Sequence, residues 1–208
     1  MSKRKEIHER VLTATDKDEL ASAYAEWADH YDQDLLGELG YVAPALACER
    51  LLSYLTDPEA RILDAGCGTG IVGKLLHQED YLNLEGLDYS VHMLDKAREK
   101  GVYRKLYQAD LTAPLDLADD DYDAVVSVGT FTCGHVGPAA LDELIRVTGP
   151  EGYLCFTVRD QAWEEDDYQA AMERLTRQDA WRLKEEKTFD YLQQEGSSCK
   201  VCVYQKTA

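Results

Sequence analysis

One segment of the chain, residues 62–70, has residue types and spacing suited to binding a small charged ligand. It reads Ile-Leu-Asp-Ala-Gly-Cys-Gly-Thr-Gly, so a short apolar run leads into three glycines at alternate positions, and a helical pattern follows. A glycine-rich turn between a strand and a helix brings backbone N–H groups and the positive end of a helix against a ligand. Three glycines so close together exceed what a simple turn needs, and the segment therefore predicts a ligand-binding loop.

Two common phosphate-binding patterns do not fit this loop. A dinucleotide site requires G-x-G-x-x-G, and the position that needs its third glycine holds Ile71. A nucleoside-triphosphate loop requires G-x-x-x-x-G-K-[ST]. Residues 68–74 match its beginning, but Leu75 lacks the hydroxyl that would hold Mg²⁺.

Asp64 narrows the class of ligand further. Its carboxylate stands two residues before the first glycine, where it would repel a pyrophosphate. It could instead cap the following helix, but its place at the end of an apolar strand favours ligand contact. A carboxylate suits this position when the ligand carries a positive group. S-adenosylmethionine has an ammonium, a sulfonium, a carboxylate and a neutral nucleoside, and the loop favours it over NAD or ATP.

The loop resembles the first motif of the class I S-adenosylmethionine-dependent methyltransferases, D-x-G-x-G-x-G, which runs here from Asp64 to Gly70. Further segments resemble the later motifs of that family in the same order: 84–88, 107–111, 122–129 and the turn at 149–152, where Glu151 departs from the pattern. Residues 24–39, with Tyr41 and Pro44, are also similar to the small methyltransferases of the Williams–Beuren region methyltransferase-like group.

The resemblance implies which residues hold the cofactor. Asp64 and the glycine backbone would hold the methionine moiety, Asp88 the ribose hydroxyls, and Asp110 the adenine amine. Asp88 could also cap the helix after it, although Ser90 is better placed to do so. The cofactor-binding residues expected are Asp64, Gly66, Cys67, Gly68, Gly70, Asp88, Tyr89, Ser90, Met93, Asp110, Leu111, Val128, Gly129, Tyr24, Trp27 and Tyr31.

The three aromatic residues of that set form a stripe at helical spacing. Tyr24, Trp27 and Tyr31 fit an ordinary packed helix face. The resemblance places this helix over the cofactor, so that a tyrosine could touch its methionine end.

Residues after the fourth and fifth expected strands are candidates for the reacting side, because ligands gather at the carboxyl ends of parallel strands. We expect Phe131, His135 and Arg159 to bind the substrate. His135 is the candidate catalytic base, since the pKa of histidine suits neutral pH. A structural or solvated histidine fits the same position, because methyl transfer to some acceptors needs no base.

Strand and helix patterns alternate along most of the chain. Helical spacing is found from residue 18 through Leu35, and again at 44–55, 69–77, 91–100, 139–148 and 162–177. Strand patterns cover 62–64, 82–88, 103–109, 122–128, 153–158, 181–192 and 199–206.

This alternation predicts an α/β fold with a Rossmann-like, seven-stranded mixed sheet. The sheet should be mostly parallel, with an antiparallel strand in a C-terminal hairpin and helices on both faces. We expect residues 1–57 to form a helical lid segment and residues 58–208 to form the S-adenosylmethionine-binding core.

Composition limits the setting. The 208 residues carry a formal charge of −18, which disfavours nucleic acid as a partner, and 45% are apolar, which is too many for a disordered chain. No apolar run approaches the roughly 20 residues that cross a bilayer, and the basic start is not followed by the apolar stretch of a secretory signal. We expect a cytoplasmic protein with a small-molecule substrate.

The cysteines support a reducing compartment and no metal site. Cys199 and Cys202 have C-x-x-C spacing, but they fall in a strand pattern, where a separation of three puts the thiols on opposite faces. A second pair that could complete a zinc site is missing from the sequence.

Three functions remain open at this point. The first is a methyltransferase acting on an N, O, S or C atom of a small molecule by in-line displacement. The second is a sensor or regulatory module that binds S-adenosylmethionine without turnover. A nicotinamide-dependent reductase is the third, and Ile71 counts against it. A protein acceptor also stays open, while the sequence does not determine the acceptor or the oligomeric state.

Overall fold

The computed structural model describes residues 7, 10–11, 13–14, 17–132 and 136–208. Its centre is a seven-stranded sheet in the order β3-β2-β1-β4-β5-β7-β6. Neighbouring strands are parallel except for β7, which is antiparallel to both β5 and β6. The strands are β1 (Ile62–Ala65), β2 (Leu84–Asp88), β3 (Lys105–Gln108), β4 (Tyr122–Phe131), β5 (Thr148–Arg159), β6 (Trp181–Leu192) and β7 (Ser197–Lys206). This topology confirms the predicted fold class.

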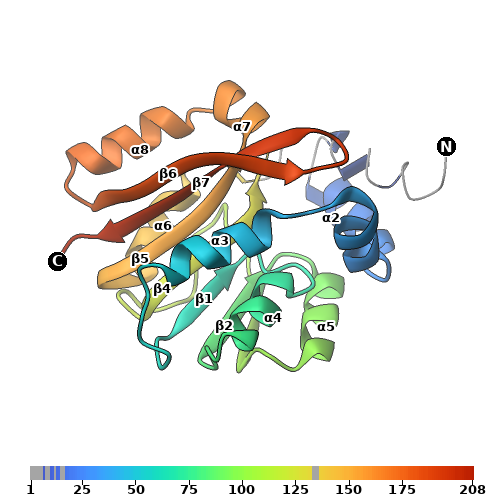
Figure 1. The fold of residues 1–208 in the computed structure, drawn as a ribbon, viewed down its shortest axis with the longest axis horizontal. Helices are drawn as coiled ribbons and strands as arrows, with labels where there is room; N and C mark the ends of the chain where they lie inside the picture. The colour runs from blue at the N-terminus through green and yellow to red at the C-terminus, as the bar shows by residue number, and fades with distance from the viewer. Residues whose placement is uncertain (1–6, 8–9, 12, 15–16, 133–135) are drawn as a thin grey trace.

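Helices cover both faces of the sheet (Figure 1). One face packs against α3 and α4, and the other packs against α6, α7 and α8. α5 lies against β2 and β3 at the edge. The helices are α2 (Lys17–Trp27), the π-helix η1 (Gln33–Leu39), α3 (Ala43–Leu52), α4 (Ile71–Gln78), α5 (Val91–Lys100), α6 (Ala140–Val147), α7 (Asp160–Glu165) and α8 (Tyr168–Arg177). Within the described ranges, none of these helices combines the length and the apolar character of a membrane span.

Alternation along the strands divides the core into two layers. In β7, Cys199 and Val201 face the α3 layer, whereas Cys202 and Tyr204 face the layer of α6 and α8. The two thiols of the C-x-x-C pair therefore lie on opposite faces, as the strand spacing predicts. Both are buried and unpaired in the structure.

Some element boundaries differ from the predicted ones. The helical stretch 162–177 is two helices, because Asp166 and Asp167 separate α7 from α8. The predicted turn at 149–152 is an irregularity inside β5: Tyr122 pairs with Thr148 and Ala124 with Tyr153, and Glu151 has a positive φ of 61°.

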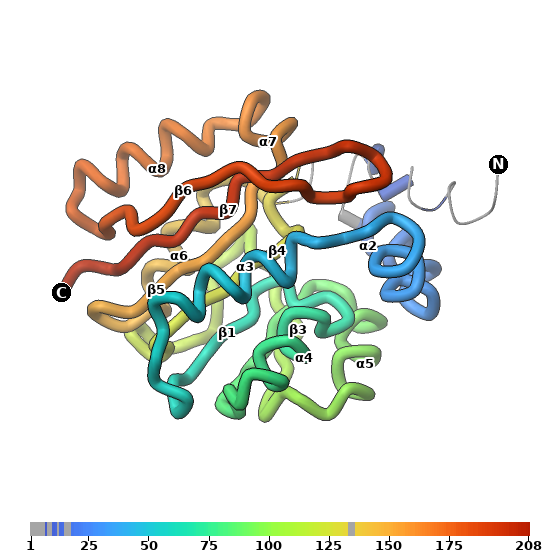
Figure 2. The backbone as a smooth tube through the Cα atoms, viewed as in Figure 1, coloured from blue at the N-terminus to red at the C-terminus, as the bar shows by residue number. Residues whose placement is uncertain are grey.

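The segment after α2 is tied to α5 and to the glycine loop. Lys96 pairs with Asp29 at 2.8 Å, and Lys100 pairs with Asp32 at 2.7 Å. Asp32 also accepts a hydrogen bond from the Thr69 hydroxyl, and Lys100 donates to the Thr69 carbonyl at 2.6 Å. These contacts hold α2 and η1 beside the loop end of the sheet, where the tube in Figure 2 places α2 next to α5.

Glycines around the Tyr103 ring allow α4 to pack closely on β2. A Cβ atom at Gly73 would lie 2.3 Å from the Tyr103 hydroxyl, and one at Gly70 or Gly86 would lie within about 3.2 Å of the same ring. The hydroxyl accepts a hydrogen bond from the Gly73 N–H at 3.2 Å and donates one to Asp64 at 2.6 Å. The ring is therefore pinned at its polar end and cannot easily move away.

We expect Gly73→Ala to lower the free energy of unfolding by about 1–3 kcal/mol, because the added methyl group overpacks a fixed ring. Urea denaturation measures the loss. Gly37→Ala is the matched control, since a Cβ there meets nothing within 4 Å, and it should change stability by less than about 0.5 kcal/mol. Equal stabilities for the two variants would contradict the packing role of Tyr103.

Candidate functional site: two adjoining cavities

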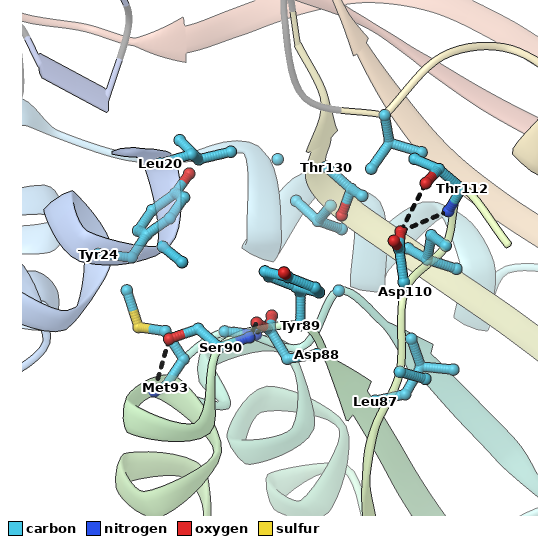
Figure 3. Close-up of a pocket in the computed structure, with 18 of the residues that line it drawn as sticks. Leu20, Tyr24, Leu87, Asp88, Tyr89, Ser90, Met93, Asp110, Thr112 and Thr130 are labelled. Atoms are coloured by element: carbon cyan, nitrogen blue, oxygen red, sulfur yellow. Dashed lines mark hydrogen bonds between the residues drawn. The ribbon is translucent and has the colours of Figure 1, made fainter. Parts of the chain in front are cut away.

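A cavity, partly open to solvent, lies where β1, β2 and β4 end; its empty space is about 840 Å³ when the open solvent at its mouth is counted. Parallel α/β sheets bind ligands at this edge, where the strand order changes direction. Figure 3 shows α2 on one side, the loop of Asp88 and Ser90 below, and the segment of Asp110 and Thr112 opposite. The lining residues are Leu20, Ala21, Tyr24, Tyr31, Gly66, Gly68, Leu87, Asp88, Tyr89, Ser90, Met93, Ala109, Asp110, Leu111, Thr112, Val128, Gly129, Thr130 and Val136.

The glycine loop is held against the end of β2 by backbone hydrogen bonds. The N–H groups of Gly66 and Cys67 both donate to the Leu87 carbonyl, at 2.8 and 2.9 Å. Gly66 and Gly68 have positive φ values of 77° and 52° and line the cavity. A Cβ at Gly66 would lie 2.3 Å from the Thr130 hydroxyl, whereas one at Gly68 would enter open space. The loop thus presents bare backbone to a ligand.

Asp88 is fixed by the same loop. One carboxylate oxygen accepts the Gly68 N–H and the other accepts the Ser90 N–H, both at 2.8 Å. A carboxylate has about four acceptor positions, so Asp88 keeps capacity for a ligand hydroxyl besides the backbone N–H groups of Gly68, Ser90 and Tyr89. Burial raises the pKa of Asp88 above its usual value, and these backbone N–H groups oppose that shift. The geometry suits a ribose diol.

Asp64 lies behind the glycine loop instead of at the cavity wall. Its side chain is buried, and it accepts the Tyr103 hydroxyl at 2.6 Å. Burial raises the pKa of Asp64 to about 7, although the Tyr103 hydrogen bond works against this shift. Asp64 is not among the described residues that line the cavity, and its expected contact with the methionine moiety stays a prediction. In the structure Asp64 holds the Tyr103 hydroxyl, and the Tyr103 ring packs against Gly73 of α4 and Gly86 of β2.

The remaining predicted cofactor residues on β2, α5 and the loop after β3 line the cavity. Ser90 caps α5, accepting the Met93 N–H at 3.4 Å, and Tyr89 is the exposed member at 42%. Asp110 accepts both the backbone N–H and the hydroxyl of Thr112, at 2.8 and 2.7 Å. These residues offer an apolar slot with one carboxylate at its far end, which suits a purine with an amino group.

A second, smaller and partly open cavity adjoins the first, and Tyr24, Tyr31 and Gly129 line both. It is lined by Val11, Tyr24, Trp27, Tyr31, Leu35, Tyr41, Gly129, Thr132, Arg159, Tyr191 and Leu192. The chain brings these together over long distances, since Tyr41 forms an isolated antiparallel bridge with Leu192. Arg159, a predicted substrate-binding residue, lines the second cavity and not the first.

Besides Asp64, three of the predicted cofactor-binding residues do not line the first cavity. Trp27 is buried and donates its indole N–H to Asp34 at 2.9 Å, so it lines only the second cavity. Cys67 packs against α5 in a small apolar cluster, and Gly70 caps α4.

The expectation for Phe131 is corrected. Its side chain is fully buried on the α6–α8 face, with ring centres 5.7 Å from Phe156 and 5.6 Å from Tyr168. Alternation along β4 turns it to the same face as Val125, away from both cavities. His135 lies outside the described residues.

Several lining residues were missed from the sequence. Leu20 could have been predicted from the sequence, because it shares the helical face of Tyr24. Thr112 could have been predicted as well, because it lies two residues after Asp110. Thr130 and Val136 gave no signal, since only the path of the chain after β4 brings them to the cavity. Among the described residues, no group of three or more histidine, cysteine or acidic side chains is placed to hold a metal ion.

Comparison of the sequence with known proteins shows the family to which the chain belongs. Residues 63–156 match the family model described as "Methyltransferase domain". Human Methyltransferase-like protein 27 is 36% identical over 185 residues, which cover 85% of this chain and 75% of that protein. The chain belongs to the class I S-adenosylmethionine-dependent methyltransferases. S-adenosylmethionine is the cofactor of this family, and the nicotinamide alternative is set aside.

Other relatives of this methyltransferase are longer than the matched region. The malonyl-[acyl-carrier protein] O-methyltransferase of Pectobacterium atrosepticum is 34% identical over 161 residues, covering 73% of this chain but 60% of that protein. The corresponding enzyme of Enterobacter lignolyticus is 32% identical over 148 residues, covering 70% of this chain and 55% of its own length.

Solved structures show the same fold at lower identity. A TehB-like methyltransferase from Corynebacterium glutamicum has a TM-score of 0.62 and 23% identity, with 92% of this chain and 100% of that chain covered. An S-adenosylmethionine-dependent methyltransferase from Mesorhizobium loti has a TM-score of 0.59 and 16% identity, with 76% and 96% covered.

The raised pKa of Asp64 predicts a pH-dependent stability. Because the folded protein holds this proton up to about pH 7 and the unfolded chain releases it near pH 4, Asp64 makes folding less favourable as pH rises between these values. The Asp64→Asn variant lacks this dependence and keeps an oxygen for Tyr103. Its stability relative to wild type should rise by up to about 1.4 kcal/mol per pH unit from pH 4.5 to 7, then level off. Urea denaturation at four pH values checks this, and parallel curves would refute it.

Proposed function

We propose that this methyltransferase transfers the methyl group of S-adenosylmethionine to a small-molecule acceptor held in the second cavity. The observation that carries the proposal is the meeting of the two cavities at Tyr24, Tyr31 and Gly129. One cavity has the polar groups that suit the cofactor, and the other lies directly beside it, where an acceptor would have to bind. The formal charge of −18 supports a small molecule over a nucleic acid.

In this proposal the cofactor lies across the edge of the sheet. The backbone of Gly66 and Gly68 borders its methionine part, and Asp88 receives the ribose hydroxyls. Tyr89 and Leu111 enclose the adenine, with Asp110 at its amino group. Support comes from the cavity that these residues line together and from the acceptor positions left on Asp88.

The cofactor supplies a methyl group already activated on a sulfonium. The chain therefore has to hold the acceptor atom in line with that group and to keep water out, without a covalent enzyme intermediate. Tyr24 and Tyr31 stand between the two cavities and suit both tasks.

We also infer that the N-terminal segment, set as residues 1–57, acts as a lid over residues 58–208. Its support is α2, which lines both cavities.

An oxygen atom is one of the acceptor types that the relatives suggest, because several are named O-methyltransferases. Carbon, nitrogen and sulfur stay open for this chain. One measurement distinguishes a methyltransferase from the alternative, a module that binds the cofactor without turnover. A methyltransferase forms S-adenosylhomocysteine in the presence of an acceptor, whereas a sensor binds the cofactor and forms none.

Asp88→Ala tests the cofactor geometry. Removing a charged acceptor of ribose hydroxyls costs about 1.5–3 kcal/mol, so we expect the affinity for S-adenosylmethionine to fall at least tenfold. Calorimetric titration with S-adenosylmethionine and S-adenosylhomocysteine measures the change.

Asp95→Ala is the matched control for that experiment. Asp95 lies on α5 as an exposed partner of Arg98, so its removal deletes the same charge without touching the cavity. Thermal unfolding shows whether each variant folds. Wild-type affinity in a folded Asp88→Ala variant would overturn the ribose assignment.

A further inference from the structure

The second cavity combines aromatic walls with one charged side chain. Tyr24, Tyr31, Tyr41 and Tyr191 line it, and the rings of Tyr41 and Tyr191 meet edge to face with centres 5.0 Å apart. Among the described residues that line this cavity, Arg159 alone carries a formal charge. The cavity therefore places one positive group among aromatic side chains.

Arg159 has donors available for an anion. It ends β5, and its side chain is only 16% exposed. The guanidinium lies 5.6 Å from the centre of the Tyr191 ring. The nearest Glu195 oxygen is 3.7 Å from the guanidinium nitrogen, which is longer than a hydrogen bond. Because a guanidinium has five N–H donors, this loose ion pair leaves most of them for another partner.

The tyrosines supply neutral hydroxyls close to that charge. Burial is the main cause that raises the pKa of Tyr41 and Tyr191 above the usual value, so both hydroxyls keep their protons at neutral pH. A Cβ built at Gly129 would lie 2.5 Å from the Tyr41 hydroxyl and 3.1 Å from that of Tyr191. Both hydroxyls therefore point to the place where the second cavity meets the first.

We propose that the second cavity is the acceptor site and that it takes a small molecule bearing a carboxylate, which Arg159 binds among the tyrosine hydroxyls. This inference rests on the proposed function and names its class of acceptor. A planar carboxylate matches the fork of a guanidinium. Arg159 would repel a cationic amine, and a phosphate dianion would leave excess negative charge beside Glu195.

The test compares acids with their uncharged amides. Benzoate and hexanoate are titrated into wild type in the presence of S-adenosylhomocysteine, with benzamide and hexanamide as partners of equal shape, and ligand-observed NMR or calorimetry reports binding. We expect saturable binding of at least one acid and about tenfold weaker binding of its amide. Amides that bind as well as the acids, or acids that show no saturable binding, would overturn the proposal.

Three variants assign the preference to one side chain. Arg159→Gln should bind acid and amide alike, whereas Arg159→Lys should keep part of the preference because the charge remains. Arg177→Gln is the control, since it removes the same charge from the exposed end of α8. Thermal unfolding confirms that each variant folds. Wild-type discrimination in a folded Arg159→Gln variant would exclude Arg159 as the anion site.

Cofactor binding is measured separately, so that two kinds of failure can be told apart. Arg159 does not line the first cavity, and Arg159→Gln should change the affinity for S-adenosylhomocysteine by less than about twofold. If wild type binds no S-adenosylhomocysteine, the proposed function is rejected. The carboxylate proposal is then tested by titrating the acids in the absence of S-adenosylhomocysteine. Normal cofactor binding without discrimination between acid and amide would reject only the carboxylate proposal.

Discussion

The contact between the glycine loop and the end of β2 is the constraint on which the site depends. Two successive N–H groups, from Gly66 and Cys67, share the Leu87 carbonyl, and the next residue donates to Asp88. The backbone must turn sharply to make these bonds, and positive φ values at alternate positions allow it. One set of hydrogen bonds therefore shapes the loop and aims the carboxylate of the neighbouring strand.

Two aspartates at the ends of adjacent strands have different roles because of what covers them. Asp64 is sealed under the Tyr103 ring, and burial raises its pKa to about 7. Asp88 is held by two backbone N–H groups and faces the cavity. Gly73 of α4, Gly70 just before it and Gly86 of β2 make room for Tyr103, and with this packing Asp88, but not Asp64, is among the residues that line the cavity.

Local rules in the sequence determined the framework of this protein. Alternating and helical periodicities predicted the seven strands, the mixed sheet and the opposite faces of Cys199 and Cys202. The loop at 62–70, the capping role of Ser90 and the position of Asp88 at a strand end follow from short-range chemistry as well. Each of these features depends on residues within one or two neighbouring elements, so the sequence pattern contains them.

Only the tertiary structure decided which side chains the two cavities share. A helical stripe of Tyr24, Trp27 and Tyr31 has one periodicity, yet Trp27 turns to Asp34 while the tyrosines line both cavities. The second cavity joins Tyr41 with Arg159 and Tyr191, which lie more than a hundred residues along the chain. Periodicity shows which face of an element is apolar, but the surface that this face meets is set by long-range packing, and the second cavity is a product of that packing.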